Sequence, residues 1–191
     1  MSLSKPYKLA FTLFGAYYEG LYYNPIKTKS LTSSTIAMLA NLTAQYMAGA
    51  KRLDQDSLIA FGLFGLLFGG SIPHFFYQML DQVAPDSSPR YVIKQLLLER
   101  LIFTPLYQMF VIYMLARFES KTHQQAMSQL VQLYWPLLRA NWTWITIPQL
   151  LNLTYVPPIL RVLVSNLIGY VWTVFLAHKK RKADSRRNRL D

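Results

Sequence analysis

The fold of this chain is decided by the stretch WPLLRANWTWITIPQLLNLTYVPPILRVLVSNLIGYVWTVFLAHKKRK, which runs from Trp135 to Lys182. Its second half, residues 159–177, is apolar except for four positions: Arg161, Ser165, Asn166 and Thr173. A hydrocarbon layer about 30 Å thick needs roughly 20 helical residues to cross it. This half therefore predicts a transmembrane helix.

A basic block follows that helix directly. It contains seven cations, Lys179, Lys180, Arg181, Lys182, Arg186, Arg187 and Arg189. Cations beside a span favour the cytoplasmic side of a membrane, which predicts a cytosolic C-terminus. Residues 183–191 are read as a basic polar tail, either a solvated flank or an element for targeting and lipid binding.

Composition supports a membrane protein with one integral domain, residues 1–182. Of 191 residues, 52% are hydrophobic and only 15% are charged. The net charge of +11 would suit nucleic acid on a soluble fold, but here the cations flank apolar spans, so lipid headgroups are the expected anionic partner and nucleic acid is not. The chain has no cysteine and only three separated histidines, so we expect no metal site and no cofactor.

Four apolar segments are long enough to be spans, at residues 30–49, 57–80, 91–118 and 159–177. They predict an all-α, polytopic membrane bundle. The first is rich in small and hydroxyl residues, which suits close helix contact. The second carries a GxxxG spacing from Gly65 to Gly69, which predicts a close helix neighbour, and Pro73, which predicts a kink.

Two aromatic segments, residues 7–23 and 135–156, are expected to be amphipathic helices at the membrane interface, because tyrosine and tryptophan favour the headgroup level. The second is broken by prolines and could be partly re-entrant. An even number of spans then puts both termini on the same side, which the distribution of lysine and arginine predicts to be the cytosol.

Polar residues within these segments are the candidate site. An ionised side chain at the bilayer centre costs at least ~2.5 to 3.5 kcal/mol, so such residues should face inward. The candidates for a pore lining or a buried polar cluster are Gln45, Glu99, Arg100, Arg139, Gln149, Asn152, Arg161 and Asn166. We expect Glu99 to pair with Arg161, with Arg100 or Arg139 as alternative partners.

Each of these residues also has a purely structural interpretation. Glu99 with Arg100 could form a clamp that fixes helix register, and this is favoured over a role in lining a conduction path. Amides within spans commonly join helices by hydrogen bonds, and only their clustering suggests a pore. For His74, beside Phe75, an interfacial hydrogen bond is favoured over a ligand or a proton relay.

Catalysis is not expected. The sequence contains no GxSxG elbow, no phosphate-binding P-loop, no HExxH motif and no paired carboxylates at a spacing suited to acid and base catalysis.

The chain resembles a family of small integral membrane proteins of peroxisomes and the mitochondrial inner membrane, grouped around peroxisomal membrane protein two and Mpv-seventeen. The resemblance extends over roughly residues 22–179. It rests on LLLERLIFTP, which contains Glu99 and Arg100, and on a block formed by Trp135, Pro136, Arg139, Asn141, Trp142, Gln149, Asn152, Tyr155, Val156, Pro157, Arg161, Asn166 and Trp172. Asn41 and the HFFY block at residues 74–77 resemble the peroxisomal branch.

The resemblance implies a homo-oligomeric, channel-like protein that passes small hydrophilic metabolites across the peroxisomal membrane without ATP hydrolysis. Its implied partners are membrane lipids, small hydrophilic solutes, other copies of the chain and the machinery that imports peroxisomal membrane proteins. Two alternatives remain: a mitochondrial inner-membrane relative that affects metabolite homeostasis, and a non-conducting structural or lipid-interacting membrane protein.

Overall fold

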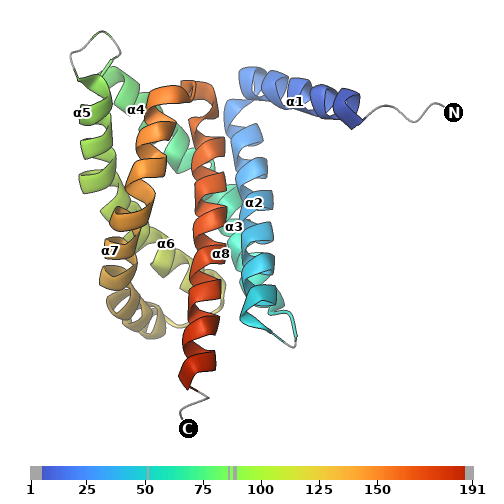
Figure 1. Cartoon of the computed structure of the whole chain (residues 1–191), viewed down its shortest axis with the longest axis vertical. Coiled ribbons are helices and arrows are strands. Elements are labelled where there is room, and N and C mark those ends of the chain that lie inside the picture. Colours follow the sequence, from blue (N-terminus) through green and yellow to red (C-terminus); the bar gives the residue numbers. More distant parts are fainter. Residues whose placement is uncertain (1–5, 51, 86, 88–89, 188–191) are drawn as a thin grey trace, which may run out of the picture.

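The structure is a computed structural model that describes residues 6–50, 52–85, 87 and 90–187, and every regular element among them is a helix. Five rods run along one bundle (Figure 1): α2 (Pro25–Ala48); α3 (Gln55–Phe64) continued by η1 (Gly65–Gly69) and α4 (Ser71–Val83); α5 (Tyr91–Leu98) continued by η2 (Glu99–Phe103) and α6 (Thr104–Phe118); α7 (His123–Tyr155); and α8 (Arg161–Arg187). A short 3₁₀ turn, η3 (Pro158–Leu160), joins α7 to α8.

Three of the expected spans are confirmed as helices that are long and apolar enough to cross a membrane: Gln55–Val83, Tyr91–Phe118 and Pro158–Phe175. The expected count of four is not confirmed. The fourth segment, residues 30–49, does lie in a helix, α2, but that helix is not among those with sufficient length and hydropathy. Its serines and threonines lower its hydropathy. Several of them contact other helices, namely Ser30, Ser33, Ser34 and Thr43, whereas the exposed Thr35 bonds the carbonyl oxygen of Leu31 in its own helix.

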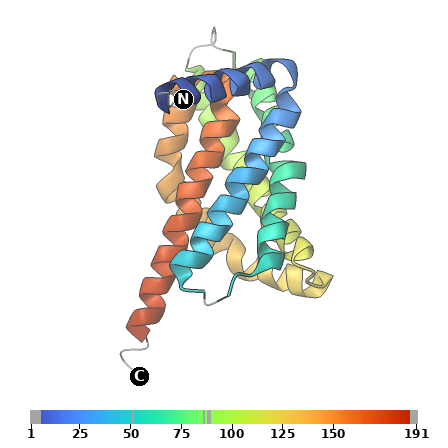
Figure 2. The ribbon, with the colours of Figure 1, turned by 90° about the vertical axis from the view of Figure 1, so that its right-hand side faces the viewer.

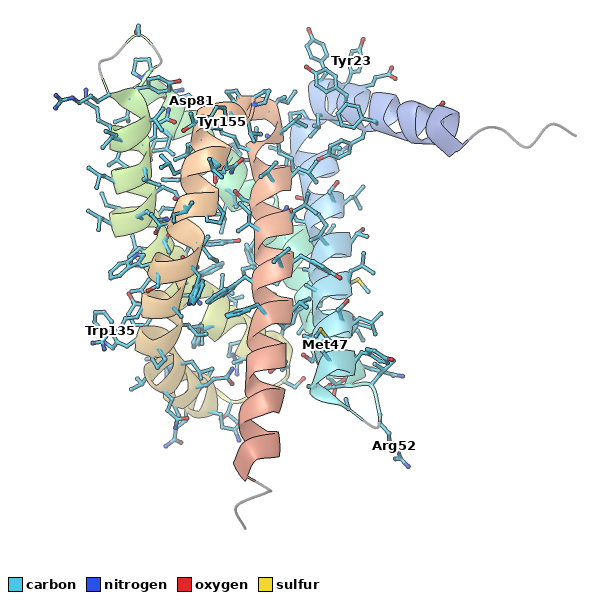
Figure 3. The ribbon with its side chains drawn as sticks, in the orientation of Figure 1. Tyr23, Met47, Arg52, Asp81, Trp135 and Tyr155 are labelled. Atoms are coloured by element: carbon cyan, nitrogen blue, oxygen red, sulfur yellow. The ribbon has the colours of Figure 1, made fainter. Side chains whose placement is uncertain are left out.

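The N-terminal helix α1 (Pro6–Tyr23) lies across one end of the bundle instead of running along the rods (Figures 1 and 2). Most of its described aromatic residues are exposed, with Tyr22 and Tyr23 at 73% and 70%, whereas Tyr17 is half-buried. Tyr23 points away from the bundle in Figure 3. This orientation suits the interfacial helix that the sequence predicts at residues 7–23.

Helix α7 differs from the prediction. It starts at His123, not near Trp135, and it continues without interruption through Pro136 and Pro148 as one of the rods. The start has a local cause: Thr122 Oγ1 accepts from the Gln125 backbone N–H, and Gln125 Oε1 accepts from the Thr122 backbone N–H, which is a capping box.

Because α7 runs the length of the bundle, α8 ends at the opposite end from α1 (Figure 1). The bundle therefore does not have the arrangement that an even number of passes predicts, with both ends of the chain on one side. The end near α1 also holds the turn between α4 and α5 and the α7–α8 junction. The other end holds the α2–α3 and α6–α7 connections.

Glycines let α2 pack directly on the second rod. A Cβ atom at Gly65 would lie 2.6 Å from the Ser34 Cα and 2.7 Å from the Ser33 carbonyl oxygen. A Cβ at Gly70 would overlap the backbone of Ser30. The close helix neighbour predicted from the glycine spacing is therefore confirmed, and it is α2 of the same chain.

The apolar core is concentrated near the α7–α8 junction. Tyr77, Leu80, Leu153 and Val162 form a buried cluster there, contributed by α4, α7 and α8. Farther along the bundle, towards its other end, the rods separate enough to leave a cavity among them.

Candidate functional site

The cavity has a volume of about 280 Å³ and is bordered by all five rods. Most of its lining is apolar, from residues such as Phe64, Phe103 and Ile145. Its polar lining comes from every rod: Ser33, Tyr77, Glu99, Arg100, Thr104, Tyr107, Gln108, Asn141, Ser165, Asn166, Tyr170 and Thr173. A cavity with a few convergent polar groups is the default location for a binding or transport site.

An ion pair forms one part of the cavity wall. Arg100 donates from Nη2 to Glu99 Oε1 at 2.5 Å and from Nε to Glu99 Oε2 at 2.8 Å, so both carboxylate oxygens are bound. The two residues are only 4% and 7% exposed. A bidentate pair of this kind is the arrangement that best compensates two charges removed from water.

The pair depends on a local change of helix type. Adjacent residues in an α-helix point in different directions and do not face each other. Glu99 and Arg100 open the π-helical segment η2, whose wider turn brings the two side chains together. The sequence expectation that Glu99 binds Arg161 is therefore wrong, and the alternative partner Arg100 is correct.

Helix α7 holds the other side of this pair. Arg100 Nη1 donates to Asn141 Oδ1 at 2.9 Å, and the Trp142 Nε1–H donates to the Arg100 carbonyl oxygen at 2.9 Å. In the π register the Arg100 carbonyl would accept from residue 105, but Pro105 has no N–H. Trp142 therefore donates the hydrogen bond that Pro105 cannot donate to the Arg100 carbonyl oxygen. A backbone carbonyl at membrane depth needs such a partner.

A hydrogen-bonded chain closes the cavity towards the α7–α8 junction. The Tyr77 hydroxyl lies 2.8 Å from Ser165 Oγ and accepts from Gln149 Nε2 at 2.5 Å. Asn152 Nδ2 donates to Ser165 Oγ at 3.0 Å. Gln149 and Asn152 are 2% and 1% exposed, and they lie behind the lining rather than on it. Their role in the structure is to join α7 to α4 and α8.

Asn166 is the one amide among the sequence candidates that lines the cavity. Its Nδ2 donates to Ser33 Oγ at 2.6 Å and so links α8 to α2 across the wall. Ser33 also lies within 3.3 Å of a Cβ placed on Gly69. The lining here is thus set by the same close packing that the glycines allow.

Arg161 lies outside the cavity, at the end of the bundle that carries α1. Its Nη1 donates to Asp81 Oδ1 at 2.7 Å, and its other nitrogens donate to the carbonyl oxygens of Leu153 and Val156. Figure 3 shows Asp81 and Tyr155 at this end of the bundle. Arg161 therefore ties the last turn of α7 to α4.

Two further candidates lie away from the cavity. Gln45 donates to Asn41 and to the Asp54 carbonyl oxygen and accepts from the Asp54 N–H, which fixes the α2–α3 connection. Arg139 is exposed, with its guanidinium 5.9 Å from the Trp135 ring centroid. Figure 3 shows Trp135 pointing away from the bundle.

His74 forms a hydrogen bond, as the sequence favours, but the partner lies inside the bundle. Its Nδ1 lies 2.9 Å from Lys29 Nζ, and both residues are buried, at 7% and 5% exposed. This contact joins α4 to the first turns of α2, next to the close approach at Gly70.

Sequence reasoning missed several residues that build the site, namely Ser33, Tyr77, Asp81, Asn141, Trp142 and Ser165. Tyr77 entered the sequence argument only as part of the HFFY block at residues 74–77. A signal was present, because the buried positions Pro73, His74, Tyr77 and Leu80 repeat at helical spacing and mark the inward face of α4. No comparable pattern marks the serines.

Comparison of the sequence with known proteins identifies the family. The family model of the Mpv17 / PMP22 family matches residues 116–177, which include α7 and most of α8. Peroxisomal membrane protein 2 of Bos taurus is 31% identical over 160 residues, covering 80% of this chain and 82% of the relative. The chain belongs to the Mpv17 / PMP22 family.

Other members resemble the chain over nearly its whole length. PXMP2/4 family protein 3 of Dictyostelium discoideum is 31% identical over 95% of this chain and 100% of its own. The mitochondrial inner membrane protein Mpv17 of Caenorhabditis elegans is 22% identical over 83% of this chain and 88% of its own. No solved structure matches the chain. The family thus comprises organelle membrane proteins with both peroxisomal and mitochondrial relatives, and the peroxisomal ones are the more similar of those compared here.

Proposed function

We propose that this protein is a passive pore for small hydrophilic solutes in the peroxisomal membrane, with its path through the central cavity of a single bundle. One observation carries the proposal: polar residues from all five rods converge on one cavity inside a bundle of membrane-length helices. Polar side chains are costly at this depth, so their convergence favours a solute path over random placement.

The proposal requires that α2 and α7 also cross the membrane. At 1.5 Å per residue, the 24 residues of α2 extend about 36 Å, and residues 133–155 of α7, which follow its polar first turns, extend about 35 Å. Both exceed a hydrocarbon layer of about 30 Å. The buried serines of α2, Ser30 and Ser33, need not meet lipid, because α2 packs on η1 and α8. The exposed polar first turns of α7, residues 123–132, lie outside the proposed crossing. Low hydropathy is therefore compatible with five crossings.

The wall chemistry suits weak, unselective passage. Glu99 and Arg100 neutralise each other, and the remaining polar lining consists of hydroxyl and amide groups. Such groups can replace part of a solute's hydration shell while still releasing the solute. Flux should therefore fall with solute size more steeply than it changes with the sign of solute charge. No reaction is part of this proposal.

Liposome reconstitution with size-graded neutral and charged solutes tests conduction. Because the chain has no cysteine, single cysteines can then locate the path. Asn166→Cys and Ser33→Cys should react with a membrane-impermeant thiol reagent and lose flux. Ser87→Cys, in the exposed turn before α5, is the matched control that should react without loss of flux. Asn152→Cys should stay unreactive because residue 152 is buried behind the lining.

A conducting preparation in which both lining cysteines stay unreactive would move the path elsewhere, for example between copies in a homo-oligomer. A preparation that does not conduct at all would favour the alternative of a structural membrane protein. The completeness of the hydrogen bonds around Arg100 is the observation that favours this alternative, since the pair is fully satisfied without any solute.

Five crossings also change the proposed topology. Arg52, Lys121 and the basic block belong to the end of the bundle where α8 ends. Because cations favour the cytoplasmic side, this end should face the cytosol. Helix α1 should then face the organelle lumen. Protease added to intact organelles should remove a C-terminal epitope and leave an N-terminal one protected. Loss of both epitopes would restore the even number of passes that the sequence alone suggests.

A further inference from the structure

A second hollow lies on the outer surface, between α7 and α8. This groove has a volume of about 490 Å³ and is lined almost entirely by apolar atoms. Trp144 and Pro148 line it from α7, and residues from Val164 to Phe175 line it from α8. Within the part of the chain that the structure describes, nothing covers it, and Trp144 and Val171 are 56% and 66% exposed.

The groove has the length of one lipid leaflet. Its α8 side is a stripe with helical spacing that runs from Val164 through Leu167, Ile168, Val171 and Trp172 to Phe175. At 1.5 Å per residue this stripe extends about 17 Å. Half of a hydrocarbon core about 30 Å thick is about 15 Å. A single acyl chain from one leaflet therefore fits the stripe from end to end.

Charge defines the end of the groove. Directly after Phe175, α8 continues through positions 178, 179, 182 and 186, which helical spacing places on the same face and which are histidine, lysine, lysine and arginine. Figures 1 and 2 show this end of α8 projecting beyond the other helices. A face that is apolar for one leaflet and then cationic is complementary to an anionic phospholipid.

We propose that the groove between α7 and α8 binds an anionic phospholipid, with an acyl chain along the stripe from Val164 to Phe175 and its phosphate at the basic block. The groove and the cavity share Ile145, Ile168 and Trp172, which line both. A bound lipid therefore covers a wall that is only one layer of side chains thick. The site does not depend on whether the cavity conducts.

Tryptophan fluorescence provides the test, because the two groove tryptophans can be separated from the others. The full-length protein is placed in phosphatidylcholine vesicles with a fixed small fraction of phosphatidylglycerol. Two vesicle preparations are compared: in one the acyl chains of the anionic lipid are brominated, and in the other those of an equal amount of the neutral lipid. Bromine quenches on contact, so the comparison reports which lipid occupies the groove.

The brominated anionic lipid should quench more strongly than the neutral one, with a preference of about fivefold or more, as expected for one cation acting near the membrane surface. The Trp144→Phe/Trp172→Phe variant should lose this preference, whereas Trp135→Phe should keep it. Lys179→Gln/Lys180→Gln/Arg181→Gln/Lys182→Gln should abolish it. Arg52→Gln, which removes an exposed cation at the same end, should leave it intact.

Equal quenching by the two lipids in the unaltered protein would overturn the proposal, because it would mean that the groove meets bulk lipid only. Weak quenching by both, together with disulfide-linked dimers of a Val171→Cys variant, would also overturn it and would assign the groove to a second copy of the chain. Retention of the preference after removal of the four cations would overturn the assignment of the phosphate site.

Discussion

Two π-helical segments, η1 and η2, border the same cavity, but one packs against a neighbouring backbone and the other forms an ion pair. In η1 the face towards α2 has no side chains at Gly65 and Gly69, so a neighbouring backbone packs directly against it. In η2 the corresponding irregularity brings two charged side chains, Glu99 and Arg100, into contact with each other. A widened turn is thus used once to admit a helix and once to build a polar group. The same backbone feature does not by itself indicate a site.

The largest expected effect comes from breaking the pair in η2. Glu99→Gln or Arg100→Met leaves one buried charge without compensation and should cost roughly 3 to 5 kcal/mol of stability, whereas the double variant should be much milder. Thermal unfolding in detergent measures all three. The pair Glu119–Lys121, whose lysine side chain is 38% exposed, is the matched control and should cost about 1 kcal/mol or less when broken. Strict additivity of the two single effects would reject a coupled pair.

Filling the glycine face of η1 should be the next most damaging change. Gly70→Ala places a Cβ against the Ser30 backbone, which cannot move aside as a flexible side chain would, and should cost about 3 kcal/mol. The control is Gly169→Ala in α8, where a Cβ meets nothing within 4 Å. That change should be neutral or stabilise the helix by up to about 1 kcal/mol. Similar melting temperatures for the two variants would contradict the close approach of α2.

Substitution of Trp142 tests whether its hydrogen bond to the Arg100 carbonyl oxygen compensates for the N–H that Pro105 lacks. Trp142→Phe removes the donor to the Arg100 carbonyl oxygen and should cost about 1 to 3 kcal/mol, because that oxygen is left unsatisfied. Pro105→Ala restores a backbone N–H nearby. In the Pro105→Ala background, Trp142→Phe should therefore cost clearly less. An equal cost in both backgrounds would mean that the tryptophan acts by packing alone.

The contrast between the two segments also explains which parts of the structure the sequence could predict. Three spans followed from apolar runs of sufficient length, and the close contact at Gly65 followed from glycine spacing. The pairing of Glu99 did not follow, because neighbours in sequence do not meet in an α-helix and nothing in the sequence announced a π turn. Arg161 was assigned to the wrong acid because its partner Asp81 lies in another rod, and only the packing brings the two together.

Helix α7 was misjudged for a different reason. Its polar first turns resembled a loop, and Pro136 and Pro148 suggested a broken helix. Proline costs a soluble helix about 3 kcal/mol, but a helix held by neighbours on several sides can retain its course. The sequence does contain a capping-box pattern, Thr122-x-x-Gln125, at the observed start of the helix, but it was not used in the prediction. Local capping signals were therefore more informative here than hydropathy.

The capping box gives the smallest predicted effect and sets a scale for the two π segments. It is exposed, at the end of the bundle, and it fixes only where α7 begins. Thr122→Ala should cost about 1 kcal/mol, and Thr122→Ser should cost much less because serine keeps the hydroxyl that accepts from the Gln125 N–H. Thermal unfolding in detergent measures both changes, and hydrogen exchange of the first turn of α7 locates the effect. The pair in η2 and the close contact at η1 should each exceed this cost severalfold. If Thr122→Ala lowered the free energy of unfolding as much as Gly70→Ala, the start of α7 would limit the stability of the bundle. The close packing of α2 next to η1 would then contribute no more than an exposed helix cap.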